Sequence, residues 1–162
     1  MKDKKVKFEV WKRIGLGTIK KDEFPEVLKS QGYDISAGAW KILEDPGFRV
    51  ASEESEVNLV KVRLKQLGFK KKTTFTQVYK RAEQLGLGMC PPEVGPQLRL
   101  QYPDQVPGEW IIVAMKPIQS RVFGVDYNNF GKYLNSVNLQ GIIWIKLVTD
   151  PARNYSWIFL KE

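Results

Sequence analysis

Residues 90–110 read CPPEVGPQLRLQYPDQVPGEW, and this stretch divides the chain into two parts of different character. It holds five of the nine prolines, the single cysteine, three carboxylates and one arginine. Gly95-Pro96 would interrupt a long helix, because proline in a helix interior costs about 3 kcal/mol. We therefore predict a rigid connector over residues 90–109, between a mixed helix and strand region at 1–89 and a run of strands at 110–162.

Upstream of this connector, the sequence predicts two strands and three helices. Residues 6–14 and 57–64 alternate between apolar and polar side chains, as strands do. Helices need a short polar side chain at the N-cap and an apolar stripe. The N-caps we expect are Asp22, Ser36 and either Thr74 or Thr76, and the last of these helices should run to Leu85.

Downstream of the connector, the pattern is that of strands. Residues 110–115 are apolar throughout, 121–127 alternate and lead into a hairpin turn at 128–131, and 142–148 and 155–160 complete the set. Helices that precede a run of strands indicate an α+β fold. We predict a single α+β domain over 1–162, with its helices mainly in the N-terminal half and an antiparallel β-meander of about four strands in the C-terminal half.

The positive charge is concentrated in one segment. The chain has 26 basic and 18 acidic residues, a formal charge of +8, and residues 57–82 contain eight basic residues and no acidic one. The remainder of the chain is therefore neutral. These eight residues are Lys61, Arg63, Lys65, Lys70, Lys71, Lys72, Lys80 and Arg81.

Our leading hypothesis is that this basic segment, residues 61–81, binds nucleic acid or another polyanion without catalysis. Lysine and arginine neutralise phosphates, and the strand face of Lys61, Arg63 and Lys65 would adjoin the lysine loop and the helix. Two alternatives stay open for the same residues: a solvated face that keeps the protein soluble, and a surface for an acidic protein partner.

A winged helix is a further way to bind DNA. Residues 74–87 would be the first helix, and the next segment should then be a recognition helix. Because Gly95-Pro96 interrupts the segment, only Pro96 to Tyr102 remains for a recognition helix. This segment is short for that role and weakly basic, since Arg99 is its one basic residue.

The composition restricts catalysis strongly. The chain has no histidine, the usual general base near neutral pH and the commonest metal ligand. Cys90 therefore lacks the partner that would lower its pKa, and we expect a small, partly buried, unreactive thiol. No cofactor motif is present, so we expect no cofactor, no metal and no catalytic residue; enzyme activity stays open, with the balance against it.

If the protein is an enzyme, we expect its site in the connector. It would act on a small molecule or carbohydrate, with Arg99 holding an anionic group and a carboxylate as base. The residues of this small-ligand site would be Glu93, Arg99, Tyr102, Asp104 and Trp110. A third hypothesis is a protein-interaction module whose basic strand is an exposed sheet edge, where lysines also prevent aggregation.

Residues 57–118 resemble a family of bacterial hypothetical proteins. The resemblance lies in LGF, Tyr-x-Arg-Ala, LGL, Cys-Pro, EVGPQLRLQY and GEW, in that order. It implies a bacterial-type soluble protein and no particular activity, cofactor or partner. The charged N-terminus and the lack of an apolar run of about 20 residues add the expectation of a cytoplasmic protein that makes no contact with a membrane.

Overall fold

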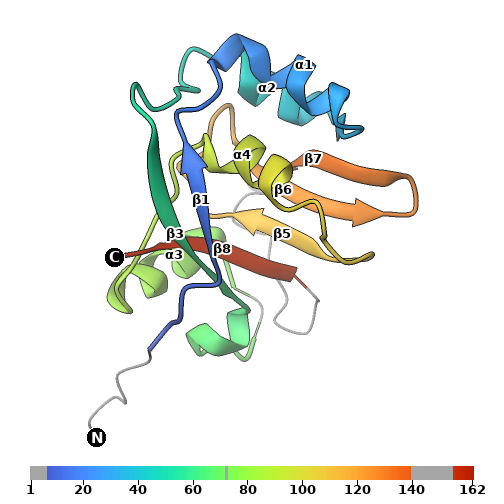
Figure 1. The fold of residues 1–162 in the computed structure, drawn as a ribbon. Helices are drawn as coiled ribbons and strands as arrows, with labels where there is room; N and C mark the ends of the chain where they lie inside the picture. The colour runs from blue at the N-terminus through green and yellow to red at the C-terminus, as the bar shows by residue number, and fades with distance from the viewer. Residues whose placement is uncertain (1–6, 72, 140–154) are drawn as a thin grey trace, which may run out of the picture.

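The computed structural model describes residues 7–71, 73–139 and 155–162, and within these a curled, mixed sheet of eight strands forms the body of the fold, a half-barrel (Figure 1). The order along the sheet is β1-β3-β8-β5-β6-β7-β2, and β4 pairs with β8 beside this path. Pairing is antiparallel except between β5 and β8 and between β2 and β7. The strands are β1 (Lys12–Leu16), β2 (Asp34–Ile35), β3 (Ser55–Val62), β4 (Leu87–Gly88), β5 (Trp110–Val113), β6 (Arg121–Asn128), β7 (Gly131–Asn138) and β8 (Tyr155–Lys161).

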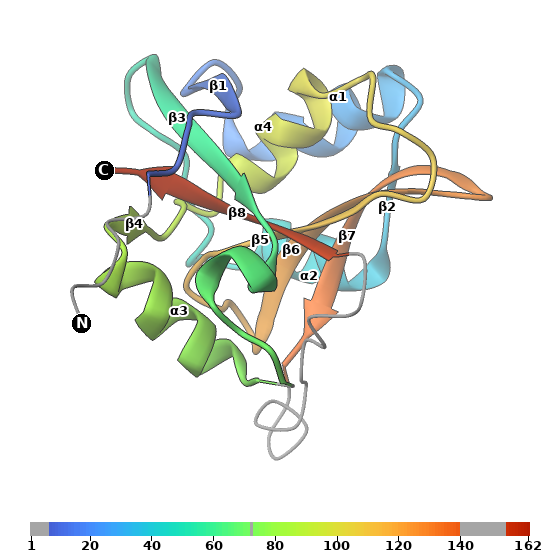
Figure 2. The same cartoon turned by 90° about the horizontal axis from the view of Figure 1, so that it is seen from below.

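In the part of the chain that the structure describes, four short α-helices and two 3-10 helices accompany the sheet. One of them, α4, lies within the curve of the sheet, while α3 lies on the other face (Figure 2). The helices are η1 (Lys21–Glu23), α1 (Phe24–Ser30), α2 (Ala37–Glu44), η2 (Leu64–Leu67), α3 (Phe75–Gln84) and α4 (Val94–Gln101). No helix in the described ranges is long and apolar enough to span a bilayer.

Both faces of the sheet are apolar where a helix packs against them. Trp157 of β8 packs against Phe75 and Tyr79 of α3, with ring centroids 4.8 and 6.2 Å apart. The next residue, Ile158, points to the opposite face, since successive strand side chains alternate. On that face Phe123 of β6 is so close to α4 that a Cβ on Gly95 would lie 2.4 Å from the phenylalanine ring.

Helix α4 also covers the free edge of β1. The side chain of Gln101 donates to the carbonyl oxygen of Gly15 and accepts from its N–H, both at 2.9 Å. One turn earlier, Gln97 donates to the hydroxyl of Thr18, and Glu93 accepts from the N–H of Gly17 at 2.7 Å. Residues four apart on a helix share one face, so this polar row bonds the strand edge in place of a further strand.

The predicted fold class is wrong. The eight strands of the described residues are spread along the chain, with three of them in the N-terminal half, and they do not form a C-terminal four-stranded antiparallel meander. The decisive departure is β8, which lies between β3 and β5 and runs parallel to β5. Local alternation cannot encode such pairing between segments that are far apart in the sequence. The strand predicted at 142–148 lies outside the described residues.

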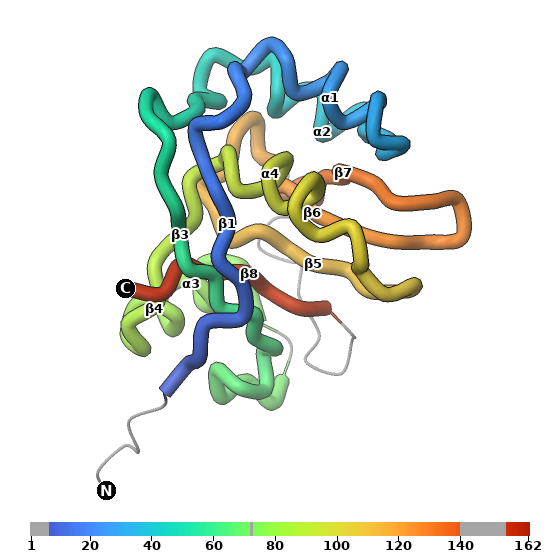
Figure 3. Tube along the Cα trace, in the orientation of Figure 1, coloured from blue at the N-terminus to red at the C-terminus, as the bar shows by residue number. Residues whose placement is uncertain are grey.

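The segment predicted as a connector contains α4, the helix most enclosed by the sheet (Figure 3). Pro96 does not break it, because Pro96 is the third residue of the helix, where its missing N–H has no intrahelical partner to lose. The helix is also too buried to be a recognition helix, since Val94 to Arg99 are all buried.

Several local predictions are confirmed. Ser36 caps α2 by accepting from the N–H of Ala39 at 3.2 Å, and Thr74 caps α3 by accepting from Gln77 at 3.2 Å. The hairpin turn at 128–131 joins β6 to β7, with Asn128 opposite Gly131. The first strand starts later than predicted, at Lys12.

Candidate functional site

The eight basic residues do not share one strand face. Strand β3 ends at Val62, and Leu64 is buried in η2, so Arg63 and Lys65 are exposed on a turn and a 3-10 helix. The predicted face of Lys61, Arg63 and Lys65 is therefore wrong. Lys72 lies outside the described residues.

Four of the basic residues line one open groove. The groove has a volume of about 580 Å³ and lies between the loop after η2 and one side of α3. Its cationic residues are Lys70, Lys71, Lys80 and Arg81. Gly68, Phe69, Thr73, Gln77 and Gln84 complete the described lining, in which there is no carboxylate. The groove is thus a concentration of positive charge that nothing in its own lining neutralises.

Helical periodicity explains the wall formed by α3. Gln77, Lys80, Arg81 and Gln84 recur at intervals of three and four, so they lie on one side of the helix. The opposite stripe, Phe75, Val78 and Ala82, is buried against the sheet. Because the apolar stripe is buried against the sheet, the opposite side of α3, which carries Lys80 and Arg81, faces the groove.

The second wall depends on a sharp turn. Gly68 ends η2 with φ at 96°, the left-handed conformation that glycine adopts without steric cost. This turn carries Phe69, Lys70 and Lys71 back beside α3, to the N-cap at Thr74. Lys70 and Lys71 are exposed, so their ammonium groups are available to a ligand.

Arg81 is held in place by the same turn. Its Nε donates to the carbonyl oxygen of Leu67 at 3.0 Å, and the side chain is half-buried. A guanidinium fixed through Nε still presents its terminal nitrogens, which bind carboxylate or phosphate in pairs. Arg81 is therefore oriented before a ligand arrives, unlike the exposed lysines.

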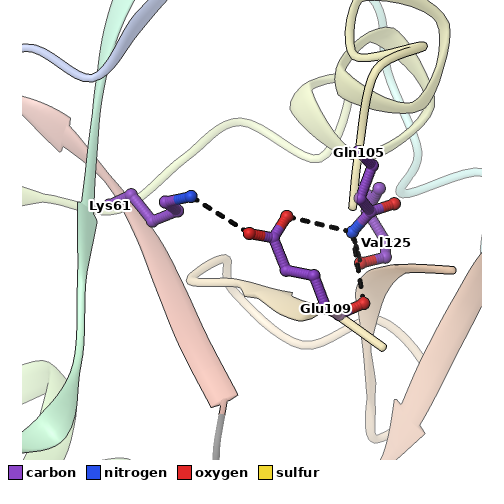
Figure 4. Close-up of polar contacts among 4 residues, drawn as sticks. All are labelled: Lys61, Gln105, Glu109 and Val125. Carbon is purple, nitrogen blue, oxygen red and sulfur yellow. Dashed lines mark hydrogen bonds and ion pairs between the residues drawn. The ribbon is translucent and has the colours of Figure 1, made fainter. Parts of the chain in front are cut away.

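Lys61 belongs to a different environment. Its Nζ lies 3.1 Å from Oε2 of Glu109 and 4.7 Å from the centre of the Trp11 ring. Glu109 also accepts from the side-chain amide of Gln105 at 3.3 Å, and that amide donates to the carbonyl oxygen of Val125 at 3.0 Å (Figure 4). Lys61 is thus neutralised inside the fold and adds nothing to the groove.

Strand β3, which carries Lys61, has different strand neighbours along its length. Ser55 to Leu59 pair with β1, and Leu59 to Val62 pair with β8. In the described pairing only Leu59 has strand partners on both sides, so the exposed edge at residues 57–65 that the interaction-module hypothesis requires stays a prediction.

The residues of the predicted small-ligand site do not converge. Arg99 is fully buried, and its two terminal nitrogens donate to four oxygens: Gln105 Oε1 and the carbonyl oxygens of Tyr102, Asp126 and Tyr133, at 2.6 to 3.4 Å. The guanidinium also lies 4.8 Å from the centre of the Tyr33 ring. Burial lowers the pKa of Arg99. Its terminal nitrogens therefore join α4 to β6 and β7, while Nε is buried without a hydrogen-bond partner among the described residues.

Glu93 has an equivalent structural role at the other end of α4. It is 1% exposed and accepts from the N–H groups of Gly17 and Ala51, each at 2.7 Å. Asp104, by contrast, is exposed in the loop that follows the helix. The base and the anion-binding arginine of the enzyme hypothesis are thus separated along α4.

The two aromatic members of that predicted site pack in different places. Tyr102 lies edge-on to Trp11, with centroids 5.1 Å apart, whereas Trp110 packs against Tyr155. Burial, followed by the hydrogen bond to Glu109, raises the pKa of Tyr102 to about 12. The hydroxyl therefore stays protonated at neutral pH.

Cys90 is buried, and this is consistent with the predicted unreactive thiol. It is 3% exposed and its Sγ donates to the carbonyl oxygen of Ile158 at 3.5 Å. Burial raises the pKa of the thiol. Within the described ranges, no three His, Cys, Asp or Glu side chains are grouped to hold a metal ion.

No protein-family model, curated protein or solved structure matches the chain. The candidate site therefore depends on its own geometry alone. Sequence reasoning missed Phe69, Thr73, Gln77 and Gln84 as part of it. The spacing of Gln77 and Gln84 around Lys80-Arg81 is a helical signal that could have found those two, but the return of the loop at Gly68 has no equally clear signal.

Proposed function

We propose that the chain binds nucleic acid through the groove beside α3, without chemical conversion of its ligand. The observation that supports this most strongly is the lining: Lys70, Lys71, Lys80 and Arg81 contribute four positive charges, and the described part of the lining holds no carboxylate. A polyanion that occupies such a groove releases counterions, and this gives affinity that falls steeply with salt.

Charge outside the groove favours the same function. Arg63 and Lys65 are exposed on the turn and 3-10 helix that lead into the groove. Because opposite charges attract over about 10 Å at moderate ionic strength, these residues add to the field that a phosphate chain meets.

Binding to a fluorescein-labelled 15-mer DNA or RNA, followed by fluorescence anisotropy over a salt series, tests this function. Lys70→Glu/Lys71→Glu should weaken binding at least about tenfold and reduce the slope of log affinity against log salt by about 0.7 per lost phosphate contact on a single strand.

The matched control is Lys41→Glu/Arg49→Glu. Both residues are exposed, the change in net charge is identical, and Lys41 lies on α2, far from α3 (Figure 1). Equal loss in both double variants would mean that net charge alone governs binding, and the groove would no longer be the site. Full affinity in Lys70→Glu/Lys71→Glu would have the same consequence.

A further inference from the structure

The size of the groove restricts which form of nucleic acid can enter it. Its volume of about 580 Å³ is comparable to that of small-ligand sites, roughly 300 to 1,000 Å³, although the groove is open on one side. A single nucleotide fits such a volume, whereas a double helix of many nucleotides does not. A duplex would have to lie across the opening, where it meets the exposed lysines and has no unstacked base to place in the groove.

An aromatic residue, Phe69, is part of the lining, among the cations. Its side chain is partly buried and packs against the hydrophobic core, and its backbone N–H donates to the carbonyl oxygen of Leu64 at 3.1 Å, which fixes the residue at the end of η2. Single-strand binding proteins combine a basic groove with aromatic side chains on which bases stack, and duplex DNA cannot use such a ring because its bases are already stacked.

Phosphate and base contacts are available side by side in this groove. The guanidinium of Arg81, tied to Leu67, is oriented for bidentate binding of a phosphate. Gln77 accepts from the hydroxyl of Thr73 at 2.7 Å and the N–H of Thr74 at 3.1 Å through one oxygen, so its NH2 group remains as the donor end of the side chain.

We infer that the groove takes single-stranded nucleic acid, with one base against Phe69 and the adjoining phosphate on Arg81. This inference rests on the proposed function. The lysines on either side then contact the neighbouring phosphates, and the position holds any base, because every base has a face that can stack.

The test compares three probes: a labelled 15-mer of thymidylate, a duplex of the same length, and inorganic polyphosphate, which has charge and no bases. We expect the single strand to bind at least about tenfold more tightly than the duplex. Phe69→Leu should weaken binding of the single strand roughly 5- to 150-fold, the range found for the loss of one stacked base. The affinity of Phe69→Leu for polyphosphate should stay within about a factor of two of the wild-type affinity.

Two further variants keep the result interpretable. Phe130→Leu removes an aromatic ring that is 85% exposed in the β6–β7 turn, and should leave all three affinities unchanged. Phe69→Trp keeps an aromatic face and should restore binding of the single strand. Circular dichroism and thermal unfolding of each variant establish that the fold is retained.

The possible outcomes distinguish failure of the single-strand inference from failure of the proposed function. If Phe69→Leu binds the single strand as wild type does, or lowers all three affinities equally, the inference is wrong and binding of a polyanion stands. If no probe binds the wild-type protein at low salt, the proposed function itself fails.

Discussion

The side chain of Gln101 bonds both backbone groups of Gly15, at 2.9 Å each, across 86 positions of sequence. A primary amide has a donor and an acceptor side by side, as a strand residue has, so Gln101 takes the place of a neighbouring strand at the edge of β1. Glu93 and Gln97 lie on the same side of α4 as Gln101. Together the three side chains hydrogen-bond this helix to β1 and to the residues that follow the strand.

Gln101→Glu should destabilise the protein by about 1–3 kcal/mol, because a carboxylate oxygen then faces the carbonyl oxygen of Gly15 and a partly buried acceptor loses its donor. Urea unfolding followed by circular dichroism measures the change. Gln31→Glu, at an exposed position, is the control. Equal midpoints for the two variants would show that the contact with Gly15 contributes nothing.

Gly95→Ala should lower the free energy of unfolding although alanine favours helices by about 1 kcal/mol over glycine. The new Cβ would lie 2.4 Å from the ring of Phe123, and overpacking of this kind costs about 1–3 kcal/mol. Combining it with Phe123→Leu should recover part of the loss, and a double-mutant cycle measures that coupling. A stable single variant without coupling would contradict the close approach.

Cys90 should react with a disulfide reagent such as DTNB at least about 100-fold more slowly in the native protein than in urea. Burial excludes the reagent and raises the pKa of the thiol, so native reaction requires local or global opening. Release of thionitrobenzoate measures the rate. Reaction at the speed of a free thiol in native buffer would place Cys90 at the surface.

Asp126→Asn should raise the stability at pH 7. Burial is the largest cause that raises the pKa of Asp126 above its ordinary 3.8. The folded carboxyl then binds a proton at a higher pH than the unfolded one does, so ionisation at neutral pH disfavours the folded state. Asparagine keeps an oxygen that can accept from the side chain of Asn128, as Asp126 does at 2.9 Å.

The gain from Asp126→Asn should disappear as the pH falls through the folded pKa toward 3.8, because wild-type Asp126 is then neutral as well. Urea unfolding at pH 4, 5.5 and 7 measures it. A difference that is the same at all three pH values would assign the effect to hydrogen bonding and not to charge.

Arg81→Lys should weaken binding of the 15-mer about fivefold while the salt slope stays nearly constant. The charge is kept, but the bond from Nε to Leu67 and the paired donors are lost. Lys80→Arg, its neighbour in the groove, should bind at least as tightly as wild type. Unchanged affinity in Arg81→Lys would show that Arg81 contributes only its positive charge to binding, and not the geometry of its guanidinium.

Part of the fold and of the candidate site could be predicted from the sequence, where the signal is local. The caps Ser36 and Thr74 act on residues three positions away, and the buried stripe of α3 follows from helical period, as does the basic side that lines the groove. The prediction failed for α4, because Gly95-Pro96 was expected to interrupt a helix, whereas Pro96 lies in its first turn. The burial of Glu93 depends on the backbone N–H groups of Gly17 and Ala51, which are distant in the sequence.

The sequence by itself determined how much positive charge the chain has, where along the chain it lies, and which catalytic groups are missing. Only the tertiary structure decided which of those charges act together. Lys61 is neutralised by Glu109, 48 positions away, while Lys70 and Lys71 reach Lys80 and Arg81 because η2 ends in a left-handed turn at Gly68. The reason is physical: charge is a property of each residue, whereas proximity depends on strand pairing and turns between distant segments.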